Sequence, residues 1–178
     1  QEQEILEKTK WIRRLEEIAL QAGEHSKLFG PSSADCQLSE AEQSKLRKAV
    51  LSKGAFRTMA VHIRHFERMM SWARRNGLEI FPISIDLVLK YALFLNEQSC
   101  GPTVIASVKA AIAWVCLRLC LQAPDIRDPR LTALESQVVE ARAKELKEAV
   151  PFPLLLVMML ERFVVRHAAD QPVLAFFV

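Results

Sequence analysis

The chain has 178 residues, of which 51% are hydrophobic and 25% charged, so it can bury the core of one globular domain with appendages. Its net charge of +3 is too small to indicate a partner by itself. The basic surplus is concentrated, however: residues 56–150 contain 13 Lys or Arg against 10 Asp or Glu, whereas the segments on either side are balanced. Such a local surplus is typical of a nucleic-acid surface.

The four cysteines argue against a metal centre. They form no C-x-x-C pair, and no histidine stands at metal-ligand spacing, so we expect neither a metal nor a cofactor. Cys116 and Cys120 lie one helical turn apart in an apolar run, where reduced thiols behave as small hydrophobic groups. The first ten residues are mostly polar and charged and do not have the pattern of a signal peptide. We therefore expect an intracellular protein with free thiols.

Two helices separated by a polar loop are predicted in the first 55 residues. Residues 5–22 carry apolar side chains at helical spacing along one face, and a polar segment follows them. Ser39 and Glu42 have the spacing of a capping box, which predicts a short helix ending near Ser52. We hypothesise that the apolar face of the first helix packs on a neighbouring protomer.

Four helices joined by short loops are predicted in the middle of the chain. Turn and cap residues mark their ends: Asn76-Gly77, Phe81-Pro82, Ser84, Gly101-Pro102 and Asp128-Pro129. The expected ranges are 56–75, 85–98, 103–121 and 130–149. Short connections between helices are typical of a compact bundle.

The third of these helices, residues 103–121, is apolar and roughly as long as a bilayer is thick. Lys109 and Arg118 lie within it, and a lysine near the centre of a membrane span costs about 2.5–3.5 kcal/mol on insertion scales. We therefore predict a helix buried in protein and no membrane partner.

The last part of the chain begins with Pro151-Phe152-Pro153, which predicts a hinge or a domain boundary. An apolar helix is expected over 154–169, and the terminal residues 173–178 are the one stretch with a strand-like pattern. The predicted fold is all-α, a compact four-helix bundle with an extra N-terminal helix and one helix of a further domain. The expected regions are 1–55, 56–150 and 151–178.

The helix over 56–75 has a basic face and an apolar face. At about 100° per residue, four arginines fall within an arc of about 40°, a set that we call the arginine row: Arg57, Arg64, Arg68 and Arg75. Val61 lies at the edge of the same arc, while Met59, Phe66 and Met70 lie opposite, where a core-facing stripe belongs. Without an anionic partner the row would repel itself. An ordinary solvated helix face remains the alternative.

The middle segment resembles the core-binding domain of tyrosine recombinases, the phage-integrase and Cre-like family, some of whose members are carried by mobile elements. The residues that carry the resemblance are Thr58, His62, Phe66, Met69 and Trp72, then "IFP" at 80–82, "KYALFL" at 90–95 and "PTVIASVKAAIAWV" at 102–115. Residue 62 departs from the family pattern, which has an aromatic residue there. The segment 150–164 is similar to the start of that family's catalytic domain.

The resemblance implies a helical domain that clamps one side of duplex DNA. Its first helix would present Arg57, Val61, Arg64 and Arg68, and its third helix would present Thr103, Ala106, Ser107 and Ala110. Arg142, Lys144 and Lys147 correspond to the basic exit toward the interdomain linker. Guanidinium groups suit both phosphates and guanine edges, so we expect Arg68, Arg74 and Arg75 at phosphates and Arg57 and Arg64 at base edges.

The resemblance also implies what lies outside this sequence. Recombinases of this family cleave and rejoin DNA through a tyrosine nucleophile surrounded by Arg, Lys and His. Tyr91, the only tyrosine, matches a structural aromatic position, and the first catalytic arginine would follow Val178, so we expect no catalytic residue here. We expect double-stranded DNA as partner, self-association on DNA and no small-molecule ligand. A location on DNA follows, in a eukaryotic nucleus or the bacterial cytoplasm.

A helical protein–protein interaction module without DNA binding is the main alternative. It would explain the amphipathic helices equally well, and the arginine row would then meet an acidic partner. His62 and the three tryptophans lie among apolar positions, so packing roles are expected for them.

Overall fold

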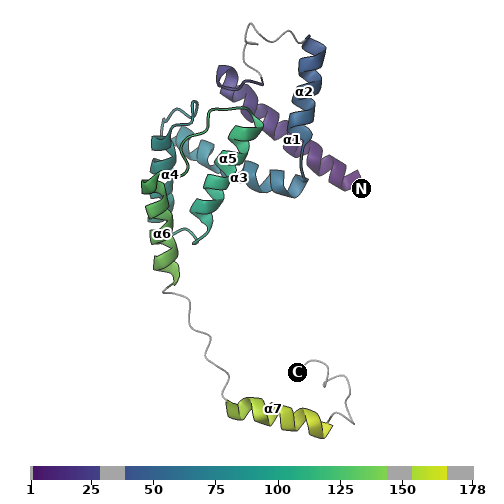
Figure 1. Cartoon of the computed structure of the whole chain (residues 1–178), viewed down its shortest axis with the longest axis vertical. Coiled ribbons are helices and arrows are strands. Elements are labelled where there is room, and N and C mark those ends of the chain that lie inside the picture. Colours follow the sequence, from purple (N-terminus) through teal and green to yellow (C-terminus); the bar gives the residue numbers. More distant parts are fainter. Residues whose placement is uncertain (1, 29–38, 144–153, 168–178) are drawn as a thin grey trace. The chain divides into compact units, whose positions relative to one another are not determined.

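A computed structural model describes residues 2–28, 39–143 and 154–167, and every regular element among them is helical (Figure 1). The α-helices are α1 (Glu2–Ala22), α2 (Glu40–Ser52), α3 (Phe56–Arg75), α4 (Ile85–Glu97), α5 (Val104–Arg118), α6 (Pro129–Ala143) and α7 (Leu154–His167). A short 3-10 turn covers Gly23–His25. The predicted all-α class is confirmed. Residues 1–143 form one compact unit, and residues 144–178, which include α7, form another.

The predicted helix starts are confirmed by their caps. Ser39 Oγ accepts from Glu42 N, and the Glu42 carboxylate accepts from Ser39 N at 2.8 Å, which completes the capping box of α2. Ser84 Oγ accepts from Leu87 N at 3.2 Å to begin α4. Asp128 Oδ1 accepts from Arg130 N at 2.8 Å at the start of α6. These short-range signals need no tertiary contact to act, which is why they can be read from sequence.

The end of α3 is also confirmed. Gly77 has φ +64°, in the left-handed region that favours glycine, and Leu78 N donates to Ala73 O at 3.0 Å. Asn76 Nδ2 donates to Trp72 O at 2.8 Å, so a further carbonyl of the last turn is satisfied.

Several helix boundaries differ from the predictions. α1 begins at Glu2 rather than residue 5, and the end of α4 and the starts of α5 and α6 differ by one residue. The predicted residues 168–169 of the last helix lie outside the described residues. α5 ends at Arg118 rather than 121 because Cys120 adopts φ +50° and Leu121 N donates to Cys116 O at 2.9 Å. Leu119 is fully buried outside the helix, so the apolar run continues past the helix end. The predicted residues 144–149 of the fourth helix and the strand-like 173–178 lie outside the described residues.

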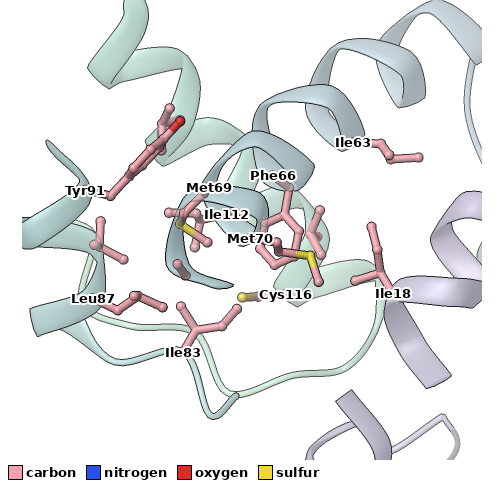
Figure 2. Packing of buried hydrophobic residues seen from close by; sticks show 14 of the residues in the cluster. Ile18, Ile63, Phe66, Met69, Met70, Ile83, Leu87, Tyr91, Ile112 and Cys116 are labelled. Carbon is pink, nitrogen blue, oxygen red and sulfur yellow. The ribbon is translucent and has the colours of Figure 1, made fainter. Parts of the chain in front are cut away.

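The core is built around α3, which packs against α5, α1 and α4, its most extensive contact being with α5 (Figure 1). Figure 2 shows Phe66 and Met69 of α3 facing Ile112 of α5, with Ile83 and Leu87 closing the far side. Burying each side chain of this size contributes about 1.5–3 kcal/mol of transfer free energy. The buried stripe of α3 consists of Met59, Ala60, Ile63, Phe66, Met69, Met70, Trp72 and Ala73.

The apolar helix α5 is buried in protein, as predicted. Ile105, Ile112 and Cys116 are at most 1% exposed, and burial raises the pKa of the Cys116 thiol to about 11. Lys109, the charge that interrupted the apolar run, has its Nζ 2.6 Å from Glu135 of α6 in a half-buried pair. Among the described residues, no helix is both long and apolar enough to cross a bilayer.

The hypothesis that the first helix offers its apolar face to another protomer is not supported. Trp11, Leu15 and Ile18 are buried against the chain's own core, and α1 packs along α3. The sequence pattern showed an amphipathic helix but could not show that α3 supplies the partner surface. α1 is therefore part of the bundle.

Trp11→Ala tests this role of α1. Removing a fully buried indole leaves a cavity, so we expect a loss of about 3–5 kcal/mol in the free energy of unfolding, measured by urea denaturation. Leu20→Ala on the same helix is the matched control: its side chain is 65% exposed, and we expect a change within about 0.5 kcal/mol. Equal effects of the two substitutions would contradict the packing of α1 on the core.

Candidate nucleic-acid interface

The arginine row lies on the exposed face of α3. Arg57, Arg64, Arg68 and Arg75 are all exposed, as is Val61, while the apolar stripe behind them is buried. Packing on three helices fixes the rotation of α3 about its axis, so the row points outward as the spacing predicts. Within the described parts of the chain, no row arginine forms a salt bridge. The row therefore presents uncompensated positive charge.

The one acid on α3, Glu67, is held by α1 rather than by the row. Arg14 Nη1 lies 3.0 Å from Glu67 Oε2 and donates a hydrogen bond to it. Because this carboxylate is already paired, it neutralises the row less than the sequence of α3 alone suggests. Arg14 of α1 thus reduces the negative charge that Glu67 would place beside the arginine row of α3.

Arg64 is positioned by the same helix. Its guanidinium carbon lies 4.9 Å from the centroid of the Trp11 ring, within the range of a cation–π contact. The contact leaves the charge exposed but restrains the side chain over the junction of α1 and α3. Base-edge readout, which we expected of Arg64, would have to be compatible with this contact.

Arg74 lies away from the row. The rotation of about 100° per residue places it on the flank that faces α1, and its Nη2 donates to Gln21 Oε1. Arg75, one position later, points into the row face and is exposed. Of the two C-terminal arginines, only Arg75 therefore extends the row.

A hollow of about 460 Å³ opens beside the C-terminal half of the row, between α3 and α4. Arg64, Arg68 and Arg75 contribute the basic side, and Trp72, Tyr91 and Phe94 contribute an aromatic side. The Trp72 ring lies 5.2 Å from Tyr91 and 5.6 Å from Phe94, centroid to centroid, so the aromatic wall is packed. The sequence predicted Tyr91 in the core, and it is only 4% exposed.

The hollow could not be read from the sequence. Its two sides come from helices whose relative rotation is set by tertiary packing, and Tyr91 carries only the pattern of a core residue. The sole local signal was a tyrosine where an apolar helix would accept phenylalanine, since a buried phenol generally needs a polar neighbour.

The residues that the resemblance implies as DNA-facing on the third helix of the bundle lie in the first half of α5, or directly before it. Thr103 is exposed and precedes the helix without a side-chain cap, and Ser107 Oγ donates to Thr103 O at 2.8 Å. Ala110 is exposed and Ala106 is half-buried. The Ser107 hydroxyl therefore serves the helix backbone but retains its acceptor lone pairs. Arg142 belongs to α6, and Lys144 and Lys147 lie outside the described residues.

His62 has the packing role that the sequence predicts. Its ring stacks on Trp114 of α5 with 5.3 Å between centroids, and the Arg118 guanidinium lies 5.0 Å from the same indole. Among the described residues, no group hydrogen-bonds to the buried His62 Nδ1. Burial, and secondly the charge of His65, lowers the pKa of His62, while burial and Arg68 lower the pKa of His65. Both imidazoles are thereby favoured in the neutral form.

Comparison with known proteins adds no assignment: no protein-family model, curated protein or solved structure matches the chain. In the parts that the structure describes, no group of three or more His, Cys, Asp or Glu side chains is placed to hold a metal ion.

Stability should fall in mild acid. The folded pKa of His62 and of His65 lies below the usual 6.5, so the unfolded chain binds more protons there and the free energy of unfolding decreases as pH falls from about 7.5 to 5.5. We expect His62→Phe, which keeps an aromatic ring against Trp114, to reduce this decrease. Urea denaturation at the two pH values measures it.

The control is His25→Gln, at a histidine that is exposed. In this variant the free energy of unfolding should change with pH as it does in the wild type. An unchanged pH dependence in His62→Phe would show that the His62 pKa is not coupled to folding.

Proposed function

We propose that the helical bundle binds duplex DNA through the arginine row of α3, as the core-binding domain of a tyrosine recombinase would. The observation that carries this proposal is the row itself: four exposed arginines on one helix face, with none in a salt bridge among the described residues. Lone basic side chains are common on surfaces, whereas an aligned set whose neighbouring acid, Glu67, is paired with Arg14 is suited to a polyanion.

The dimensions of α3 support a duplex as the polyanion. The row extends from Arg57 to Arg75, which at about 1.5 Å per residue corresponds to about 27 Å along the helix axis. A B-DNA major groove is about 12 Å wide and admits an α-helix. Guanidinium groups also match phosphate oxygens and the O6/N7 edge of guanine through two parallel hydrogen bonds. Arg57, at the N-terminal end of α3, is our candidate for a base edge, and Arg68 and Arg75 for phosphates.

The rest of the family assignment is part of this proposal. In a longer recombinase the bundle would hold one side of the duplex while a catalytic domain supplies the tyrosine chemistry, and copies of the protein would associate on DNA. A protein–protein module would use the same row against an acidic surface. The uncompensated row suits either anion, so the two functions are separated by experiment.

The test is fluorescence anisotropy with a labelled generic duplex at several salt concentrations. We expect a log–log salt slope that becomes shallower by about 0.9 for each phosphate contact removed. In Arg57→Gln/Arg68→Gln the slope should therefore change by about 0.9, because Arg68 is the phosphate candidate and Arg57 the base-edge candidate. Affinity at about 100 mM salt should fall at least 10-fold, consistent with about 1–3 kcal/mol per contact. Arg64 is left intact because it contacts Trp11.

The matched control is Arg13→Gln/Arg130→Gln, which removes the same charge from arginines paired with Glu17 and Asp128. It should leave the affinity within about 3-fold of the wild type, because a long-range charge effect is screened at this ionic strength. Equal losses in the two double variants would mean that net charge alone drives binding. No salt-dependent binding by the wild type would reject the DNA function in favour of the protein partner.

A further inference from the structure

The ring of Tyr91 is buried, and the residue lines the hollow between α3 and α4. Tyr91 is 4% exposed and packs against Trp72 and Phe94, and no described residue forms a hydrogen bond with its Oη. Figure 2 shows the hydroxyl pointing away from Leu87 and Ile83, and Tyr91 lines the hollow between α3 and α4. Since no described group uses this donor, it is available to a ligand in the hollow.

The charges around this hydroxyl indicate the kind of ligand. Arg68 and Arg75 line the same hollow, and their positive charges act on the Tyr91 phenol. Burial raises the pKa of Tyr91 above its usual value, and these two arginines partly oppose the increase. The phenol therefore stays protonated at neutral pH and can donate. Ser71, which is exposed, adds a second hydroxyl to the lining.

Among the described residues that line the hollow, one carries a carboxylate, and it does not oppose an anion strongly. Glu67 is hydrogen-bonded to Arg14 at 3.0 Å, so part of its charge is compensated from outside the hollow. The volume of about 460 Å³ also exceeds what one small ion needs, given that a water molecule takes roughly 30 Å³ in the liquid. A phosphate with part of its attached sugar would fit, and an apolar wall of Trp72 and Phe94 would lie beside the sugar.

We propose that the hollow between α3 and α4 holds a single phosphate group, with Tyr91 Oη donating a hydrogen bond to it and Arg68 and Arg75 supplying the charge. The inference rests on the proposed function in that a duplex backbone is the expected source of the phosphate. A free phosphate presents the same chemistry and is the second source. The hollow would then fix the register of α3 on DNA, since one backbone phosphate is seated beside a rigid aromatic wall.

Two variants test this proposed phosphate site, which we call the seat. Tyr91→Phe removes one hydroxyl and keeps the packed ring, so duplex affinity should fall about 10-fold with an unchanged salt slope, because no charge is lost. Arg75→Gln should lower affinity and make the slope shallower by about 0.9. Combining them should cost less than the sum of the two, since both groups hold the same phosphate. Arg130→Gln, whose arginine is paired with Asp128, is the charge control.

Inorganic phosphate distinguishes the source. When phosphate replaces chloride at constant ionic strength, the melting temperature of the wild type should rise, and that of Tyr91→Phe and of Arg75→Gln should rise less. Phosphate stabilisation without any duplex binding would support the seat and reject the DNA function. Salt-dependent duplex binding that both variants retain at full strength, with no effect of phosphate, would overturn the seat and leave the DNA function standing.

Discussion

The burial of one face of α3 is the constraint on which the rest of the structure depends. Phe66, Ile63 and Met69 are fully enclosed by neighbouring helices, so the helix cannot rotate about its axis without exposing them to water. That restraint fixes the direction of every other residue on α3. The arginine row is outward because the apolar stripe is inward, and both follow from a single choice of rotation.

The first helix gives this arrangement its electrostatic character. α1 inserts Trp11 into the core, which brings Arg14 to Glu67 and the Trp11 ring to Arg64. The acid that would otherwise lie closest to the row is thereby paired elsewhere, and one member of the row is restrained by an aromatic face. The packing of α1, which precedes residues 56–150 in the chain, thus determines how much positive charge α3 presents.

The fourth helix, α4, forms a hollow together with the C-terminal half of the arginine row. An exposed arginine on a bare helix is flexible and loses considerable side-chain entropy on binding. Beside α4, Arg68 and Arg75 border a hollow with a packed aromatic wall and an unused phenol. Such a site differs from a diffuse basic surface because a neutral donor at its base requires an acceptor of definite position.

The sequence by itself determined the helices, most of their ends and the two faces of α3. Periodicity, Ser39, Ser84, Asp128 and Gly77 act within a few residues of the chain, so their effects do not depend on the rest of the fold. Only the tertiary structure decided that α1 packs on the core of the same chain, that Arg74 donates a hydrogen bond to Gln21, and that Tyr91 lines a basic hollow. Each of these depends on how two distant helices rotate against each other, and that rotation is set by the fit of side chains across the interface rather than by any local pattern.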